Sequence, residues 1–538
     1  SVNHASLNYR HVFLFIIFLL LLRIAGLFNV YFFEEDEISI AAGVAALVRD
    51  NIGDFYRYSP QLGYYRLIEF ISQVSGGDVK LIPSIMKYLS ALMGVLIPCL
   101  GLYIFRAELS SRARWFTAFV LLANPIVWKS SQYGNTALVA AGVAFTAITI
   151  LSNQPKFKHE ILALVLFAAA ILIRADTILL LPLLMFLFYR NHHSIKSALI
   201  YTISFGISLL AIYALLFLFD SRLDSAVEAV SNHFSLQRDT MFWEYLMWAI
   251  SPLPIIFALL GLRKLMDKQP GLLLTLLIWF IPPMAFYFAS TTTPRYFLLS
   301  VLPLSIAAAI GMMDIMTWLQ NRFTARLAWV IVIGAAFIHL FIGLGHFQSG
   351  WRASPFYGPG FRTDDGYMPT GALIYDTYFR DGFLFQSFNN PGFAKSPEPF
   401  WEGRVYNQVL DVLADGDHAN ITTLLLFARG YWHAFHYHAQ ERGVEYISRA
   451  PTTPSFPFSS ETWLKLGDAR FMTVDYHSSH YKKMKQYNVK AGDEIWFIGK
   501  TAFPDAESLK KLPSGLTITP INSFSDKILI FRVQSGAT

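Results

Sequence analysis

Long apolar segments fill the first 347 residues of this chain and limit what it can fold into. A helix needs about 20 mostly apolar residues to cross the hydrocarbon core of a bilayer. Residues 161–173 and 176–189 are too short for two full perpendicular spans, so we expect a helical hairpin that turns at Arg174, Ala175 and Asp176. The sequence therefore predicts a polytopic α-helical membrane protein. Its candidate spans, about eleven, are 12–30, 83–105, 114–131, 134–152, 161–173, 176–189, 198–219, 247–262, 270–290, 296–318 and 327–346.

The composition agrees with a membrane protein and excludes several other classes. Charged residues make up 15% of the chain, against roughly 25% in soluble proteins. Hydrophobic residues make up 54%, which excludes disorder, and the many aromatic residues fit belts at the membrane surfaces. The net charge of +6 is small and scattered, so no nucleic-acid partner is expected. The one cysteine, Cys99, excludes an intrachain disulfide and a thiolate zinc site.

The positions of Lys and Arg predict how the chain is oriented. The first span, 12–30, is too long and bulky for a signal-peptide core and lacks a small-x-small cleavage site, so we expect a retained helix. With the N-terminus in the cytoplasm, every inner loop is basic, as the positive-inside rule requires, whereas the first outer loop, 31–82, is acidic. We therefore predict a multi-pass protein of the bacterial inner (plasma) membrane. The inner basic residues are Arg10, Arg106, Arg112, Arg114, Lys156, Lys158, Arg190, Lys196, Arg263, Lys264, Lys268, Arg322 and Arg326.

The composition changes near residue 348, and the remaining sequence has no candidate span. We predict two domains: residues 1–347 in the membrane, with interfacial helices in 31–82, and a small α/β domain at 348–538. An odd number of spans places this second domain outside the cytoplasm, and a domain without disulfides is compatible with a bacterial periplasm. Its expected strands are 371–375, 422–427, 494–498 and 527–532, and its expected helices are 404–415 and 431–442.

Four successive carboxylates follow the first span, in the stretch FFEEDEIS at residues 32–39. Like charges this close make some carboxylates hold a proton more tightly, which suits a general base or a cation ligand. The alternative is a solvated acidic loop that only helps to orient the chain. The amphipathic stretch 38–49 and the tyrosines between 56 and 65 are expected to lie along the membrane surface. Carboxylates above such a surface suit an enzyme that acts on a lipid headgroup.

Four stretches of the first 347 residues share a pattern with a known superfamily. They are FEEDEIS after the first helix, ANPIVWKSSQYGNTALVAAGVAF at 123–145, AAAILIRADTILLLPLLMF at 168–186 and TTTPRYFLLSVLPLSIAAAI at 291–310. Together they resemble the GT-C glycosyltransferases, especially bacterial relatives of the family 39 protein mannosyltransferases and the aminoarabinose transferases of lipid A. The stretches correspond to that superfamily's acidic pair, its Pro-containing helix end, its helix break with a basic residue and its Pro-Arg-Tyr signature.

The resemblance implies an enzyme that takes a sugar from a polyprenyl-phosphate carrier at the outer membrane face. It passes the sugar to an acceptor hydroxyl with inversion at the anomeric carbon. Asp36 matches the family's catalytic carboxylate, the base that takes the hydroxyl proton, with Glu35 and Glu37 as its neighbours and substitutes. Arg174 and Arg295 fall at the outer ends of predicted helices, where they would stabilise the charge that grows on the leaving phosphate.

The donor-phosphate residues also have alternative interpretations. An arginine in a membrane segment can snorkel to the surface or form an ion pair, and Asp176 could pair with Arg174 at the same turn. Tyr296 is expected either to donate a hydrogen bond to the phosphate or to belong to an aromatic belt. Lys87, near the outer end of the second span, is a weaker candidate for phosphate binding.

The sequence departs from the resemblance at two places. Relatives carry Lys-Pro-Pro in the first outer loop, where this chain reads YSP at 58–60, so Arg57 or Arg66 is expected to replace the missing lysine. Relatives also carry a second acid at the start of the fourth span, where Asn135 stands and could bind a sugar or acceptor hydroxyl. The expected substrate-binding residues are Arg57, Tyr58, Arg66, Asn135 and Trp243.

Three further features have a weaker link to function. Trp243 lies in the predicted outer loop 220–246, where it could stack on a sugar or simply belong to an interfacial loop. The stretch HAFHYH contains His433, His436 and His438, which we expect to form an exposed histidine group rather than a metal site. Arg23, within the first span, is expected to snorkel.

No cofactor and no metal are expected, although the acidic loop could hold a divalent cation, as in the oligosaccharyltransferases of the wider superfamily. The expected partners are a polyprenyl-phosphate-linked sugar, membrane lipids and a lipid or glycan acceptor such as lipid A, lipopolysaccharide or another envelope glycan. The alternatives are a protein O-glycosyltransferase, a transporter or flippase of lipid-linked sugars, and a non-enzymatic scaffold. A transporter predicts internal repeats and polar residues near mid-membrane, and neither is clear in the sequence.

Overall fold

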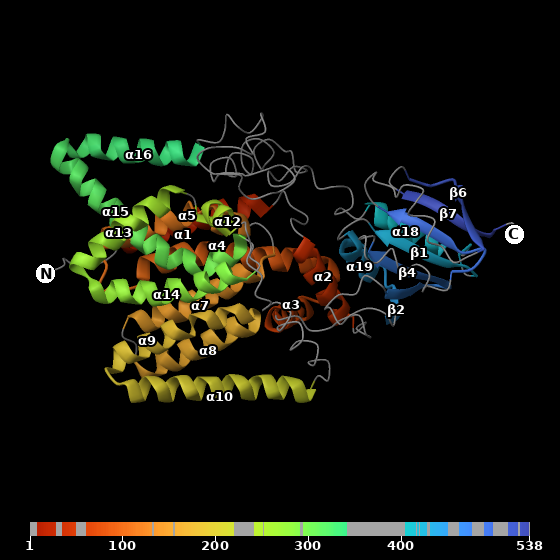
Figure 1. Ribbon diagram of the computed structural model, residues 1–538, viewed down its shortest axis with the longest axis horizontal. Helices are drawn as coiled ribbons and strands as arrows, with labels where there is room; N and C mark the ends of the chain where they lie inside the picture. Colours follow the sequence, from red (N-terminus) through yellow and green to blue (C-terminus); the bar gives the residue numbers. More distant parts are fainter. Residues whose placement is uncertain are drawn as a thin grey trace.

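The computed structural model contains a helical part and a C-terminal part built around a sheet (Figure 1). The helical part runs to Phe341, and the first element of the C-terminal part begins at Arg404, so the predicted boundary at 347/348 lies outside the described residues. The structure describes residues 8–27, 35–49, 61–131, 134–153, 156–219, 242–250, 252–290, 294–341, 404–415, 417–418, 420–427, 431–449, 462–475, 489–498, 515–525 and 528–536.

The described helices agree with a membrane protein. Four segments are long and apolar enough to cross a bilayer, namely Val79–Tyr103, Ile195–Ile212, Pro270–Ala289 and Arg295–Arg322. The total of about eleven spans stays a prediction. The helices are α1 Tyr9–Leu27, α2 Glu35–Val48, α3 Leu62–Val74, η1 Val79–Leu81, α4 Ile82–Tyr103, α5 Ser111–Leu122, α6 Pro125–Ser130, α7 Thr136–Ser152, α8 Phe157–Ile173, η2 Ala175–Leu180, α9 Leu181–His192, α10 Ile195–Phe219, α12 Phe242–Ile250, α13 Pro252–Lys268, α14 Pro270–Ala289, η4 Pro294–Phe297, α15 Leu298–Arg322 and α16 Ala325–Phe341.

The predicted hairpin at 161–189 is confirmed. Helix α8 ends at Ile173, Arg174 has an extended backbone with φ −155° and ψ 115°, and the short helix η2 leads into α9. At the far end, His192 of α9 lies 2.8 Å from the carboxylate of Glu160 near the start of α8. The chain therefore reverses direction at Arg174.

Two predicted spans are divided in the structure. Residues 114–131 form α5 and α6 because Asn124 interrupts them, and its Oδ1 accepts hydrogen bonds from the N–H groups of Ile126 and Val127. Asn124 also precedes Pro125, and the helical conformation is disfavoured for a residue that precedes a proline. Residues 247–262 are divided between α12 and α13, which begins at Pro252, a position where proline is favoured.

The middle of helix α2 has no exposed polar face, although the sequence predicts an amphipathic stretch at 38–49. Its place along the membrane surface stays a prediction. Residues 40–47 of α2 are all buried, because α2 is enclosed by α3, α4 and the C-terminal part. Tyr64 and Tyr65 of α3, expected at headgroup level, are buried as well. Helix α3 packs so closely on the end of α8 that a Cβ at Gly63 would lie 2.6 Å from the carbonyl of Leu172.

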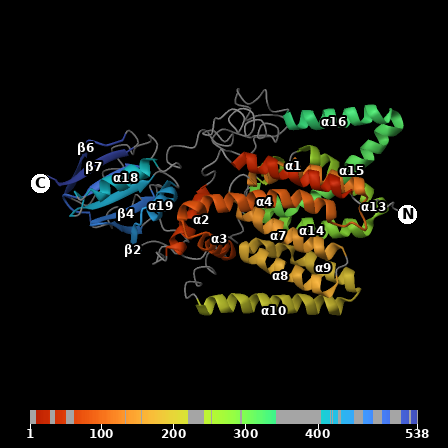
Figure 2. The ribbon, with the colours of Figure 1, turned by 180° about the vertical axis from the view of Figure 1, so that it is seen from behind.

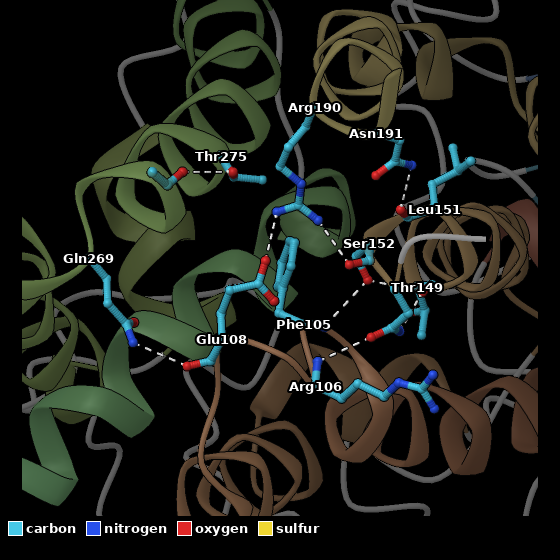
Figure 3. A network of polar contacts seen from close by, with 12 residues as sticks. Phe105, Arg106, Glu108, Thr149, Leu151, Ser152, Arg190, Asn191, Gln269 and Thr275 are labelled. Atoms are coloured by element: carbon cyan, nitrogen blue, oxygen red, sulfur yellow. Dashed lines mark hydrogen bonds and ion pairs between the residues drawn. The ribbon is translucent and has the colours of Figure 1, made fainter. Parts of the chain in front are cut away.

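Several segments predicted to lie in the cytoplasm are joined by a network of polar contacts (Figure 3). Arg190 at the end of α9 forms an ion pair with Glu108 at 3.1 Å and donates to the carbonyl of Ser152 at the end of α7. Gln269, just before α14, donates to the backbone carbonyl of Glu108. The opposite ends of these same helices surround the candidate site described below.

In the C-terminal part, the described strands form a seven-stranded mixed sheet in the order β2-β3-β4-β1-β5-β7-β6. The predicted strands 422–427, 494–498 and 527–532 and both predicted helices are confirmed, whereas 371–375 lies outside the described residues. Four strands, β2, β3, β4 and β6, were not predicted, and β6 is an edge strand that carries Pro520, as edge strands tolerate. The elements are α18 Arg404–Ala414, β1 Thr422–Phe427, α19 Tyr431–Glu441, β2 Glu445–Arg449, β3 Thr462–Leu466, β4 Ala469–Asp475, β5 Glu494–Ile498, β6 Leu516–Ile521 and β7 Ile528–Ser535.

Candidate functional site

Glu37 lies in the first turn of α2 and is completely buried. Its Oε1 accepts a hydrogen bond of 2.7 Å from the backbone N–H of Gly134, which precedes α7. Its charge also acts on the ammonium of Lys87 in α4. The backbone of Glu35 and Asp36 belongs to the same turn, and their side chains lie outside the described residues. The acidic loop is therefore connected to α7 and α4 through Glu37.

Tyr64 of α3 adds a hydroxyl to the surroundings of Glu37. Burial, and after it the charge of Glu37, raise the pKa of Tyr64 above its ordinary value. The hydroxyl therefore stays protonated and keeps a proton to donate.

The segment Gly134–Thr136 begins α7 and connects α2 to the predicted phosphate-binding residues. Asn135 caps the helix, since its Oδ1 accepts from the N–H of Leu138 at 3.0 Å, and its own N–H donates to the hydroxyl of Ser90. This capping role occupies one side of the amide that we predicted to bind substrate. Thr136 follows, and its hydroxyl accepts a 3.3 Å hydrogen bond from Arg174.

Arg174 sits at the helix break, where its side chain is 11% exposed. Its Nε forms an ion pair of 2.9 Å with Asp176, so the predicted alternative of an ion pair at this turn is present in the structure. The guanidinium carbon lies 4.8 Å from the centre of the Tyr296 ring, a cation–π contact. Arg174 is thus fixed by partners on η2, α7 and η4.

Arg295 approaches the same aromatic ring. Its guanidinium carbon is 5.9 Å from the centre of the Tyr296 ring, so the two predicted phosphate-binding arginines adjoin one tyrosine. Tyr287 of α14 stacks on Tyr296 with ring centres 5.1 Å apart and donates a 2.9 Å hydrogen bond to Asp176. These described residues include two arginines and one carboxylate, so the cluster itself carries a net positive charge.

Three buried oxygens in or next to this cluster have no hydrogen-bond partner among the described residues. They are Oδ1 of Asp176, Oγ1 of the adjoining Thr177, and Oγ of Ser290, which follows Tyr287 by three residues. Buried polar groups in proteins are nearly always paired, and the exceptions gather where ligands or water bind. Their position agrees with a polar ligand beside the two arginines.

Taken in order, these contacts form one array. It runs from Glu37 through the start of α7 to Arg174, and from Arg174 through Asp176 and the two tyrosines to Arg295. A carboxylate-bearing helix and the arginine cluster therefore lie at the same end of the helical part. Such an array offers two cations to an anionic group at one end and a carboxylate-bearing helix at the other.

The structure places the remaining predicted residues in less specific surroundings. Arg66 forms a 2.7 Å ion pair with Glu69 on α3, and Trp243 is exposed on α12, where it packs against Phe288 of α14. Arg57 and Tyr58 lie outside the described residues. Sequence analysis did not identify Tyr287, because a tyrosine in an apolar helix gives no signal beyond that of an aromatic belt.

Two further expectations are wrong. His436 and His438 are buried rather than exposed: His436 lies 3.0 Å from the hydroxyl of Thr473, and His438 lies 2.8 Å from Glu441. Arg23 does not snorkel, because it is 1% exposed and its guanidinium lies 4.2 Å from the centre of the Trp128 ring. The side chain of His433 is outside the described residues, and among those described no group of three or more His, Cys, Asp or Glu could hold a metal ion.

Comparison with solved structures shows the fold. The chain aligns with ArnT from Cupriavidus metallidurans bound to undecaprenyl phosphate at a TM-score of 0.56 and 14% identity, covering 98% of both chains. The apo form of the same protein gives a TM-score of 0.56 and 13% identity, with 97% of this chain and 98% of that one covered. No family model matches the chain, and no curated protein matches it. The match to ArnT over the whole length shows that the chain has the GT-C membrane fold.

Proposed function

We propose that this protein is an inverting glycosyltransferase that moves a sugar from a polyprenyl-phosphate donor to a hydroxyl of a lipid or glycan acceptor. The observation that carries the proposal is the array that joins the acidic helix α2 to Arg174 and Arg295. The fold adds support, because the ArnT structure that this chain resembles over its whole length binds undecaprenyl phosphate.

At the donor end, Arg174 and Arg295 bind the phosphate, with Tyr296 between them. Negative charge grows on this phosphate as the bond to the sugar breaks, and fixed cations in a low-dielectric site lower the barrier to that step. Asp176 and Tyr287 hold Arg174 in place but neutralise part of its charge. The second arginine therefore supplies the net positive charge that attracts the donor.

At the acceptor end, Asp36 is the proposed base. Its neighbour Glu37 is held to Gly134 and interacts with Lys87, which suits an anchor for α2 better than a group that exchanges protons with substrate. The first turn of a helix stabilises negative charge, so a carboxylate there stays ionised and able to accept a proton. The acceptor oxygen attacks the anomeric carbon, Asp36 takes its proton, and the electrons of the broken C–O bond leave on the phosphate.

The site is assigned to the periplasmic face of a bacterial inner membrane. The basic loops predicted to be cytoplasmic meet at the opposite end of the helices (Figure 3). The C-terminal domain, proposed as residues 348–538, contacts α2 at the site end and so lies in the periplasm, while residues 1–347 form the membrane domain. We expect catalysis by this carboxylate and these arginines to need no metal, so a chelator should leave the activity intact. Loss of activity with a chelator would instead indicate the divalent cation that the acidic loop could hold.

Transfer by the purified protein in lipid vesicles tests the proposal. A panel of polyprenyl-phosphate sugars is offered with lipid and glycan acceptors, to wild type, Asp36→Asn and Arg295→Ala, with Arg322→Ala as a control from the opposite end of α15. We expect Asp36→Asn to lose turnover, Arg295→Ala to raise the donor KM and lower kcat, and the control to match wild type. Full transfer by Asp36→Asn contradicts the assigned base, and movement of donor across the bilayer without transfer shows a transporter instead.

A further inference from the structure

The C-terminal domain contacts the acidic helix directly. Helix α19 lies alongside α2 in both ribbon views (Figures 1 and 2), and among the described elements this pair forms the most extensive contact between the two parts of the chain. Buried side chains of α2, from Ile40 to Leu47, belong to one hydrophobic cluster with Phe435 and Tyr437 of α19. The helix that carries Asp36 and Glu37 is therefore packed between the membrane domain and the C-terminal domain.

Tyr437 adds a polar contact to this packing. Its side chain is completely buried, and its hydroxyl donates a 3.2 Å hydrogen bond to the backbone carbonyl of Val79. Val79 begins η1, which leads directly into α4, the helix that carries Lys87. Helix α19 therefore packs on α2, which carries Glu37, and bonds to η1, the turn that leads into the helix of Lys87. The charges of Glu37 and Lys87 interact with each other.

The donor end of the site is built from other elements. Arg174 belongs to the break before η2, Arg295 belongs to η4, and Tyr287 belongs to α14. The contacts that hold Arg174, from Asp176, Thr136 and Tyr296, likewise come from η2, α7 and η4. Displacement of α19 thus acts first on the acceptor end of the array and leaves the phosphate-binding cluster in place.

We propose that Tyr437 is a positioning residue through which the C-terminal domain holds α2, and with it the carboxylate base, at the distance that the transfer step requires. The inference rests on the proposed function and deepens it, since it gives the C-terminal domain a part in catalysis. Catalysis is sensitive to such placement, because a shift of about 1 Å in a reacting group can cost about a hundredfold in rate.

The test compares Tyr437→Phe with wild type in the full-length protein. This substitution keeps the ring and removes only the hydroxyl, so the apolar packing survives. We expect kcat to fall by roughly tenfold while the donor KM stays within about twofold, and we expect faster amide hydrogen exchange in residues 35–48. Tyr406→Phe is the matched control, because it also removes a buried tyrosine hydroxyl, in this case from α18. The ring of Tyr406 packs against Phe427 and Phe435 within the C-terminal domain.

The outcomes separate this proposal from the proposed function. A Tyr437→Phe protein with the kcat of wild type overturns the positioning role, and so does an equal loss of kcat in Tyr406→Phe, since any weakening of the domain would then suffice. If wild type itself transfers no sugar, the proposed glycosyltransferase activity fails. In that case, amide exchange in residues 35–48 still tests whether Tyr437 holds α2. Exchange that is the same in Tyr437→Phe and wild type overturns that claim as well.

Discussion

Gly134 is the residue at which the acidic helix and the start of α7 come closest. Its N–H donates to Glu37, and a Cβ at this position would lie 2.7 Å from Cε of Met86 and 3.2 Å from Oε1 of Glu37. Glycine is needed here for space rather than for its backbone freedom, because the backbone stays in a conformation that other residues adopt. Any side chain at Gly134 must move Glu37, Met86 or the start of α7.

We therefore expect Gly134→Ala to lower kcat for sugar transfer by roughly tenfold to a hundredfold, because the displaced Glu37 takes α2 and the neighbouring base with it. Steady-state transfer assays measure the effect. Gly206→Ala in α10 is the control, since a Cβ at Gly206 has no atom within 4 Å, and it should match wild type. An unchanged kcat in Gly134→Ala would mean that the position of Glu37 does not matter for transfer.

In the C-terminal domain, Glu494 is buried at the start of β5 and accepts hydrogen bonds from Arg532 at 2.7 Å and Trp496 at 2.9 Å. Burial alone would raise its pKa, but hydrogen bonds from His418, Arg532 and Trp496 outweigh burial and lower the pKa to about 2. A carboxyl whose pKa is lower in the folded state stabilises the fold above its ordinary pKa of about 4.3, and this contribution is lost as the pH falls toward 2.

The stability of the C-terminal domain should thus decrease between about pH 5 and pH 3. Urea titration of the full chain in detergent, followed by the strand signal in circular dichroism, measures the change in midpoint. At pH 5, Glu494→Gln should have a lower urea midpoint than wild type. Its midpoint should also change less than that of wild type between pH 5 and pH 3. A wild-type midpoint that does not fall with pH would contradict the ionised, hydrogen-bonded state of Glu494.

At the residue scale, sequence reasoning identified Arg174, Asp176, Arg295 and Tyr296 because charge and proline signatures stand out against apolar helices. It could not identify Tyr287, which lies 111 residues from its partner Asp176. Nor could it foresee that Asn135 caps α7 and that Glu37 bonds to Gly134. Such contacts depend on how distant helices pack, which the composition of each helix does not specify.

Among the elements, α13 and α15 pack most tightly. A Cβ at Gly261 would lie 1.8 Å from the carbonyl oxygen of Ala307, and a Cβ at Gly311 would lie 2.0 Å from that of Phe257. Small residues that allow backbones to approach are what holds helices together in a membrane, where apolar side chains gain nothing by leaving lipid. This contact fixes α15, whose beginning follows η4 and Arg295.

Gly311→Leu should therefore destabilise the protein by about 3 kcal/mol or more, because the leucine cannot fit without separating the two helices. Thermal unfolding in detergent gives the comparison. Gly334→Leu in α16 is the control, as a Cβ there meets no atom within 4 Å. Equal unfolding temperatures for the two variants would show that α13 and α15 tolerate separation.

At the same scale, hydrophobic length predicted most helices, including α4, α7, α10 and α14, and short apolar runs predicted the central strands β1 and β5. Hydrophobic length did not predict where a local cap ends a helix, since the hydrogen bonds of Asn124 divide one apolar run into α5 and α6. It also failed for α2, whose residues look amphipathic but are buried under α19. The sequence of a single helix contains no information about a domain that returns to cover it.

For the whole molecule, the account requires two ends with different tasks. One end contains the network around Arg190 and Glu108 (Figure 3), and the other contains the acidic helix, the two arginines and the contact with the C-terminal domain. The distribution of Lys and Arg predicts such a division, because loop charge is governed by the membrane rather than by helix packing. The orientation of the two ends in the membrane stays a prediction. The central claim is that a base on α2 and a phosphate-binding cluster at Arg174 and Arg295 perform one direct displacement.

The anomeric configuration of the product tests that claim most directly. A polyprenyl-phosphate sugar of known configuration is supplied to the reconstituted protein, and the glycosidic bond formed is assigned by nuclear magnetic resonance. The account predicts a product with the configuration opposite to that of the donor, formed by wild type and absent with Asp36→Asn. A product that keeps the donor's configuration, or one formed at full rate by Asp36→Asn, would contradict it.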